Sequence, residues 1–217
     1  MESRICLLGF SGSVLSLIFN TLQDRAWSTP ILILENVRVK DDVPFESIVP
    51  YARLWHEEYE VQPGDAFCFS MMNPVVKQTV FDFFYAHHGI SRDIYTSLLH
   101  PSIIQSASST MGKGVLIEPG CVISAYARID FGVSINRGCT VGHHTIIHDF
   151  ATLNPGVHIA GHCVIGAHSS IGIGTAVFDH VTIGSHSVVG GGSVVNKNIP
   201  DGVLAFGNPC KVIREIR

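Results

Sequence analysis

The chain has 217 residues, of which 46% are hydrophobic and only 15% are charged. This length allows one or two domains with a real core, and the small charged fraction indicates a surface of small polar residues rather than salt-bridged helices. A formal net charge of −4 gives no electrostatic reason to bind nucleic acid or an anionic membrane.

The apolar run Ile5–Phe19 is the first segment to interpret, because its hydrophobicity is typical of a secretory signal. Glu2 offsets Arg4, so no basic stretch precedes the run, and glycines and serines interrupt it. No stretch approaches the ~18–20 apolar residues of a membrane span. The six cysteines form no CxxC pair, so neither a zinc ribbon nor a disulfide framework is indicated. We expect a soluble, reduced, cytoplasmic protein with no membrane span.

Residues 1–100 predict a small Rossmann-like α/β domain. The expected strands are Ile5–Leu8, Ile31–Leu34 and Ala66–Ser70, and the expected helices are Val14–Leu22 and Val75–His87. The segment GFSGS joins the first strand to the first helix, where a Gly-rich turn can accept a phosphate. Gly9 and Gly12 are its only glycines, so the GxGxxG fingerprint is incomplete, and tight strand–helix packing alone would also explain the turn.

From Ile117 to Val195, an aliphatic residue recurs every six positions. These residues are Ile117, Ile123, Ile129, Ile135, Val141, Ile147, Leu153, Ile159, Ile165, Ile171, Val177, Ile183, Val189 and Val195. The residue two positions before each of them is never larger than valine. A period of six fits neither a helix nor one long strand, but it fits short strands separated by turns, in coils that cover one another. Three cysteines of the small column, Cys121, Cys139 and Cys163, are expected to be inert core thiols.

This repeat and the tail GGGSVVNKNIPDGVLAFGNPCKVIR resemble the hexapeptide-repeat acyltransferases. The resemblance implies a mainly β protein in which residues 101–217 form a left-handed parallel β-helix with three hexads per coil. The α/β domain and the sequence HPSI at His100–Ile103 narrow the resemblance to the family of UDP-4-amino-sugar N-acetyltransferases and sialic acid O-acetyltransferases. The resemblance to this family also implies a homotrimer with active sites between subunits.

The segment VGHHTIIHDF resembles the part of that family that carries its catalytic histidine. The resemblance implies that His143 is the general base, taking a proton as the acceptor amine attacks acetyl-CoA directly. Gly161 follows one coil later and is expected to bring a backbone amide beside the imidazole to stabilise the oxyanion. The family commonly has an acid directly after its histidine, whereas this chain has His144. Another acid, Asp149 or one from a neighbouring subunit, would then orient His143, or the base is weaker.

Acetyl-CoA as co-substrate, a nucleotide sugar as acceptor and the absence of a metal are further implications of the resemblance. The residues assigned to acetyl-CoA are Thr152, Gly161, Ile173, Gly191, Lys197 and Lys211, with Arg214 adding charge nearby. The residues assigned to the nucleotide sugar are Ser11, Gly12, Ser13, Glu35, Asn36, Met72 and Asn136. Three of these depart from the family: Thr152 replaces a histidine of some members, Asn36 replaces an acid, and Met72 replaces a glycine. For the lysines, ordinary solvated surface is an equal alternative.

Eight of the twelve histidines lie in the repeat region, and coils of eighteen residues predict two ladders of stacked imidazoles. The predicted ladders are His144, His162 and His180, and His168 and His186.

Two other classes of protein compete with the N-acetyltransferase interpretation. A γ-class carbonic anhydrase would use His143 and His148, but its third zinc ligand is expected near Ala107, where no histidine occurs. A binding protein with a degenerate site stays open because of His144. The sequence does not separate amine from hydroxyl acceptors, although the N-terminal domain favours a nucleotide-linked 4-amino-4,6-dideoxy sugar.

Overall fold

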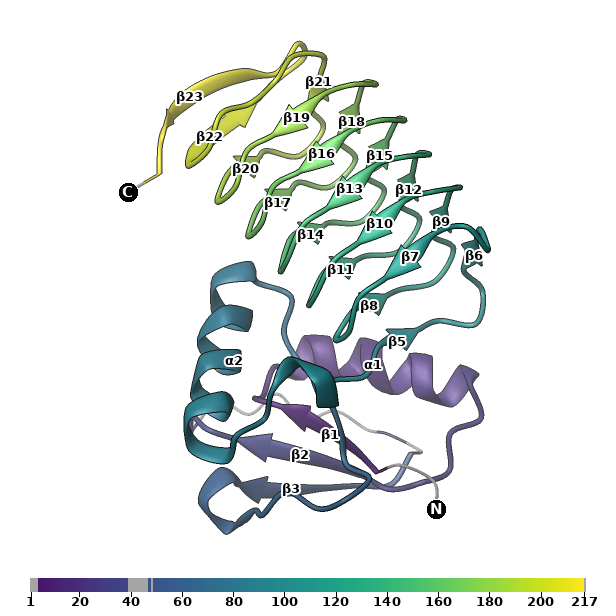
Figure 1. Cartoon of the computed structure of the whole chain (residues 1–217), viewed down its shortest axis with the longest axis vertical. Helices are drawn as coiled ribbons and strands as arrows, with labels where there is room; N and C mark the ends of the chain where they lie inside the picture. Colours follow the sequence, from purple (N-terminus) through teal and green to yellow (C-terminus); the bar gives the residue numbers. More distant parts are fainter. Residues whose placement is uncertain (1–3, 39–46, 48, 217) are drawn as a thin grey trace.

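The computed structural model describes residues 4–38, 47 and 49–216 of the chain. An α/β layer forms one end of the molecule, and a long stack of short strands rises from it toward the C-terminus (Figure 1). Among the described residues, neither helix is long and apolar enough to cross a membrane.

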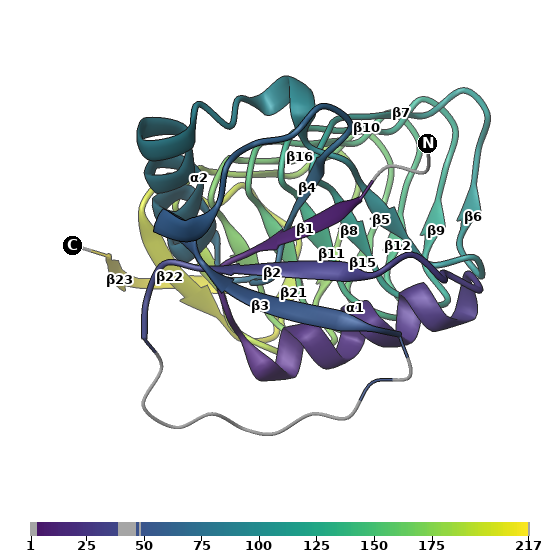
Figure 2. The ribbon, with the colours of Figure 1, turned by 90° about the horizontal axis from the view of Figure 1, so that it is seen from below.

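The α/β layer holds four parallel strands in the order β3-β2-β1-β4. The strands are β1 (Ile5–Leu8), β2 (Ile31–Glu35), β3 (Tyr51–Trp55) and β4 (Ala66–Phe69), and the helices are α1 (Gly12–Asp24) and α2 (Pro74–His88). Two short 3₁₀ turns, His56–Glu58 and Arg92–Ile94, complete the layer. Apolar residues of α1 pack on one side of the sheet and those of α2 on the other, which leaves the strands between them (Figure 2). All predicted elements are present, and β3 is the strand that the sequence did not reveal.

The remaining chain is a parallel β-helix with three faces. Face I consists of β5 (Leu98–Leu99), β8 (Leu116–Ile117), β11 (Ser134–Ile135), β14 (Thr152–Leu153), β17 (Ser170–Ile171), β20 (Val188–Val189), β22 (Val203–Phe206) and the antiparallel β23 (Lys211–Glu215). Face II consists of β6 (Ile104–Gln105), β9 (Val122–Ile123), β12 (Thr140–Val141), β15 (His158–Ile159), β18 (Ala176–Val177) and β21 (Val194–Val195). Face III consists of β7 (Thr110–Met111), β10 (Arg128–Ile129), β13 (Ile146–Ile147), β16 (Val164–Ile165) and β19 (Thr182–Ile183).

Each coil repeats after eighteen residues, so that Arg128, Ile146 and Val164 lie side by side on face III. The fourteen aliphatic positions and the fourteen small positions of the predicted columns are all 4% exposed or less. The period-six prediction of the interior is therefore confirmed. All six cysteines are free and buried, as expected for core thiols. Strand β5 already pairs with β8, so the ladder starts just before the expected boundary at residue 100.

The three corners between the faces each need a residue in the left-handed region of φ. At the corner between faces I and II this residue is glycine in successive coils, as at Gly138 and Gly156. At the other two corners, histidines and other aromatic residues take the same conformation in most coils, glycine takes it in others, and neighbouring rings stack from coil to coil. The ladder of His168 and His186, with ring centroids 4.6 Å apart, is present as predicted.

The two parts of the molecule meet where α2 lies along face I. Lys77 of α2 is fully buried, and its Nζ donates to Gly132 O at 2.7 Å, Ser134 Oγ at 3.1 Å and Thr152 Oγ1 at 3.3 Å. The Thr152 hydroxyl in turn donates to Met72 O at 2.6 Å. None of the three acceptors carries a negative charge, and burial lowers the pKa of Lys77 well below its usual value.

The lowered pKa of Lys77 therefore makes the stability of the fold depend on pH, and substitution of Lys77 isolates this dependence. Because its pKa in the folded protein lies below the ordinary 10.5, the unfolded chain binds the proton more readily. Its contribution to stability is greatest above pH 10.5 and is lost as the pH falls toward the lowered value. We expect the free energy of unfolding of the wild type to rise with pH relative to that of Lys77→Met, by at most about 1.4 kcal/mol per pH unit.

The measurement is urea unfolding between pH 7 and 10 of wild type, Lys77→Met and Lys113→Met. Lys113 is exposed, so its substitution is expected to leave the pH slope of the wild type unchanged. Equal slopes for wild type and Lys77→Met would show that Lys77 keeps an ordinary pKa inside the fold.

Candidate active site

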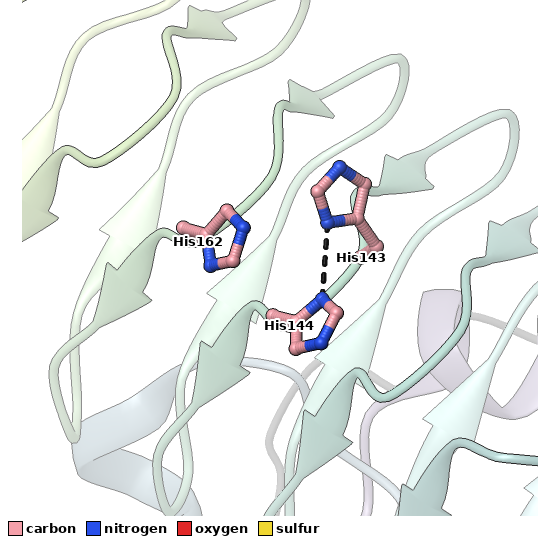
Figure 3. A group of neighbouring side chains, drawn as sticks. All are labelled: His143, His144 and His162. Atoms are coloured by element: carbon pink, nitrogen blue, oxygen red, sulfur yellow. Dashed lines mark hydrogen bonds between the residues drawn. The ribbon is translucent and has the colours of Figure 1, made fainter.

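His143 and His144 lie together at the corner between faces II and III, between β12 and β13. Both side chains are exposed, and His144 has the left-handed φ of 58° that this corner requires. The two Nδ1 atoms are 3.1 Å apart, and the rings are nearly perpendicular at 87° (Figure 3). One Nδ1 must donate and the other accept, so the hydrogen bond fixes the two rings in complementary tautomers.

Gly161 occupies the same corner one coil later, directly against the His143 ring. A Cβ atom at Gly161 would lie 2.7 Å from Cε1 and 2.8 Å from Nε2 of His143. The expected closeness of the imidazole to a bare stretch of backbone is therefore observed. The backbone of this corner is fixed by the ladder, since His162 N donates to His143 O at 2.9 Å and His180 N donates to Gly161 O at 3.1 Å.

A stack of rings continues from His144 along the corner, as the eighteen-residue spacing predicted. His144 and His162 stack with centroids 4.8 Å apart, and His162 and His180 stack at 4.9 Å with an angle of 2°. Tyr126 extends the stack on the other side of His144 at 4.9 Å. Shielding from water lowers the pKa of His162, and the neighbouring imidazoles, His144 first, lower it further.

Asp149 does not orient His143, and this alternative from the sequence is wrong within one protomer. Its carboxylate lies at the next corner, where it accepts from Arg92 Nη1 at 2.7 Å and from the backbone of Phe131 at 3.0 Å. His148, the second histidine of the carbonic anhydrase pattern, lies beside Asp130 with Nδ1 2.9 Å from Oδ2. Neither residue belongs to the cluster around His143.

The residues assigned to acetyl-CoA are distributed over two corners of the prism. Ile173 and Gly191 lie at the corner between faces I and II, where Ile173 is 62% exposed and its Cγ2 would be 2.9 Å from a Cβ at Gly191. Lys197 is exposed at the last corner of the His143 column, and Lys211 is exposed on β23. Thr152 is elsewhere: it is buried on face I, and its hydroxyl is engaged by Lys77 and Met72.

Most residues assigned to the nucleotide sugar gather at the carboxyl edge of the α/β sheet. Ser11 is the N-cap of α1 without a side-chain cap hydrogen bond, and Gly12 and Ser13 form the first turn, which carries no acid. Glu35 ends β2 and pairs with Arg53, and Asn36 follows it, half-buried. Because the strands are parallel, their carboxyl ends and these loops share one edge.

Two members of that set lie closer to the β-helix. Met72 follows β4 at the same sheet edge and contacts Thr152 of face I through its carbonyl oxygen. Asn136 is buried at the corner between faces I and II, where its Nδ2 donates to Leu153 O at 2.8 Å. The corner of His143 lies opposite face I, so one protomer does not bring the sheet-edge loops and His143 together.

Arg53 is a charged residue at this edge that the sequence did not single out. It comes from β3, pairs with Glu35, and places its guanidinium carbon 4.3 Å from the centroid of the Phe10 ring. A cation stacked beside the Ser11–Ser13 turn adds positive charge where a phosphate is expected. Arg53 was missed because strand β3, which carries this residue, was not predicted from the sequence.

Comparisons with known proteins bear on the fold. No family model matches the chain, and no curated protein matches it. The solved acetyltransferase domain of PglB from Neisseria gonorrhoeae FA1090, in complex with acetyl coenzyme A, is 24% identical over 98% of this chain and 100% of that chain, with a TM-score of 0.84. PerB from Caulobacter crescentus, in complex with CoA and GDP-perosamine, is 24% identical over 99% of both chains, with a TM-score of 0.80. WeeI from Acinetobacter baumannii AYE is 20% identical over 97% of this chain and 99% of that one, with a TM-score of 0.75. The chain therefore has the fold of these structures over its whole length.

The contact between Gly161 and His143 can be tested by adding one methyl group. In Gly161→Ala the new Cβ would overlap the His143 ring, so we expect the ring to turn away and the Nδ1–Nδ1 hydrogen bond to break. The backbone itself tolerates a side chain, because Asp179 occupies the same corner position one coil later. A crystal structure of the variant, or the ¹⁵N shifts of the imidazole, would report the change. An unmoved ring would contradict the packing described.

Proposed function

We propose that the protein is an acetyl-CoA-dependent N-acetyltransferase that acts on the amine of a nucleotide-linked 4-amino-4,6-dideoxy sugar. The observation that carries the proposal is the exposed His143 ring, held by His144 and lying against the bare backbone of Gly161. The chain has the fold of two solved structures that contain acetyl-CoA or CoA. These are the PglB domain and PerB, and the PerB structure also contains GDP-perosamine.

The base is the Nε2 atom of His143. If its Nδ1–H donates to Nδ1 of His144, the lone pair of Nε2 points away from that pair and can accept a proton. The amine nitrogen attacks the thioester carbonyl carbon, His143 takes the amine proton, and the C–S bond breaks to release CoA thiolate. The thiolate or solvent then recovers the proton. The backbone amide of Gly161 is the proposed donor to the oxyanion of the tetrahedral intermediate.

The His144 ring orients His143 but supplies no negative charge. A neutral imidazole offers only its dipole to the imidazolium that forms, whereas a carboxylate at this position would add a full opposite charge. Much of the rate must come from holding the two substrates together.

The distribution of the site over separate corners supports a homotrimer. The corner with His143 and the corner with Ile173 and Gly191 border the same face, face II. A threefold axis along face II would bring the first corner of one subunit to the second corner of the next, with acetyl-CoA between them. The outward residues of face II carry no full charge, which suits an interface; they are Ile104, Val122, Thr140, His158, Ala176 and Val194. Lys197 and Lys211 would meet the phosphates of CoA.

The α/β layer is the proposed Rossmann-like nucleotide-binding domain. The free N–H groups at the start of α1, next to Ser11 and Ser13, favour a diphosphate. Glu35 and Asn36 stand at the end of β2, where a carboxylate or amide can bind ribose hydroxyls. The same trimer would point the sugar of one subunit toward His143 of another. We also propose that the β-helix is left-handed and that the protein is cytoplasmic.

The deciding experiment measures CoA release from acetyl-CoA with a panel of UDP-4-amino-4,6-dideoxy sugars, GDP-perosamine and sialic acid. We expect one nucleotide-linked amine to be acetylated and His143→Ala to lower kcat by about 10²–10⁴-fold, the usual contribution of a general base. His180→Ala, in the same ring stack but without contact to His143, is the control. Acetylation of sialic acid alone would establish an O-acetyltransferase. Acetyl-CoA binding without turnover on any acceptor would establish a binding protein.

The pH profile tests the role of His144 separately. In His144→Glu a carboxylate beside His143 stabilises the imidazolium, so we expect the acid limb of kcat/KM to move up by about one pH unit. His144→Gln keeps a neutral partner and is expected to leave the limb in place. An acid limb that is the same in all three proteins would show that His143 is not the group that titrates.

A further inference from the structure

Three exposed imidazoles converge at the corner of His143. One ring nitrogen from each of His143, His144 and His162 lies within 4.8 Å of the chosen nitrogen of the other two (Figure 3). His162 faces both of the others, with its ring 5.0 Å from that of His143 and 4.8 Å from that of His144. The eighteen-residue coil and the left-handed corner residues hold the three Cα atoms in place, so only side-chain rotation is free.

The spacing of two of these nitrogen atoms is close to that of two ligands on one metal ion. Two imidazole ligands on a tetrahedral zinc, with Zn–N bonds of about 2.0–2.1 Å, have nitrogen atoms about 3.3–3.4 Å apart. The Nδ1 atoms of His143 and His144 are 3.1 Å apart before any metal binds. His162 is exposed, and one of its nitrogens lies within 4.8 Å of a nitrogen of each of the other two rings, so rotation of its side chain can complete the set.

We propose that His143, His144 and His162 form a binding site for one divalent transition-metal ion, with Zn²⁺ as its physiological form. Three imidazoles leave a fourth position open to water. Neutral nitrogen ligands favour Cu²⁺, Ni²⁺, Zn²⁺ and Co²⁺ over Mg²⁺ and Ca²⁺, which require oxygen.

Metal binding at this site switches off the base, a consequence that rests on the function proposed above. When Nδ1 of a neutral His143 binds the metal, its proton moves to Nε2, because an imidazole keeps one N–H. The Nε2 lone pair that accepts the amine proton is then lost. Nδ1 of His143 gives its proton to solvent, and Nε2 of the same ring takes one up from solvent. Metal binding to the neutral pair therefore releases no net proton.

The site is tested first without any acetyl transfer. Titration of the full chain with Co²⁺ is expected to give the visible absorption of a tetrahedral site, saturating at one ion per protomer and displaced by Zn²⁺. We expect His162→Asn to weaken Co²⁺ binding about tenfold or more. His180→Asn is the matched control, since it changes the next ring of the same stack at the same left-handed φ, which asparagine tolerates.

Loss of binding in His162→Asn alone supports the site. Absence of Co²⁺ binding by the wild type, binding unaffected by His162→Asn, or equal weakening in His180→Asn would each overturn it. With an acceptor in hand, Zn²⁺ should inhibit wild-type CoA release and spare His162→Asn, and a chelator should restore the wild type. Co²⁺ binding with no turnover on any acceptor would count against the proposed function and leave the metal site standing.

Discussion

The pairing of each strand with the strand eighteen residues later is the constraint on which the whole molecule depends. Along face III, Arg128 N donates to Thr145 O at 2.9 Å and Asp130 N donates to Ile147 O at 2.8 Å, and the same pattern recurs from β7 to β16. The interior columns of large and small residues follow from this register, because one inserted residue would turn every later aliphatic side chain outward. The repeat thus fixes both the core and the position of each corner side chain.

The corners determine which side chains of successive coils lie next to one another. A left-handed residue at each turn sets the direction of the neighbouring side chains, so that equivalent residues of successive coils stack at about the spacing of adjacent strands. His143, Gly161 and the rings of His144 and His162 meet for this reason, although they come from two successive coils. The same geometry keeps Asp149 away from His143, since residues six apart fall on different corners.

The β-helix interior and both ring ladders could be predicted because a period of six and a coil of eighteen are properties of the sequence itself. Strand β3 could not be predicted, because Tyr51, Ala52 and Arg53 lie exposed at the sheet edge and show no alternation of apolar and polar residues. The contact of Lys77 with face I also escaped prediction. It depends on how α2 packs against strands more than fifty residues away, and no local pattern encodes that packing.

Thr152 shows how the junction between α2 and face I restricts which residues can bind a ligand. The resemblance assigned Thr152 to acetyl-CoA, but a buried amino group needs hydrogen-bond partners, and the Thr152 hydroxyl is one of the three oxygens that Lys77 Nζ contacts. The same hydroxyl uses its only proton on Met72 O, so it has no donor left for a ligand. Met72 belongs to the loop that follows β4 at the carboxyl edge of the sheet. Thr152 therefore ties that loop to the β-helix, and its hydroxyl is committed to this junction rather than to a ligand.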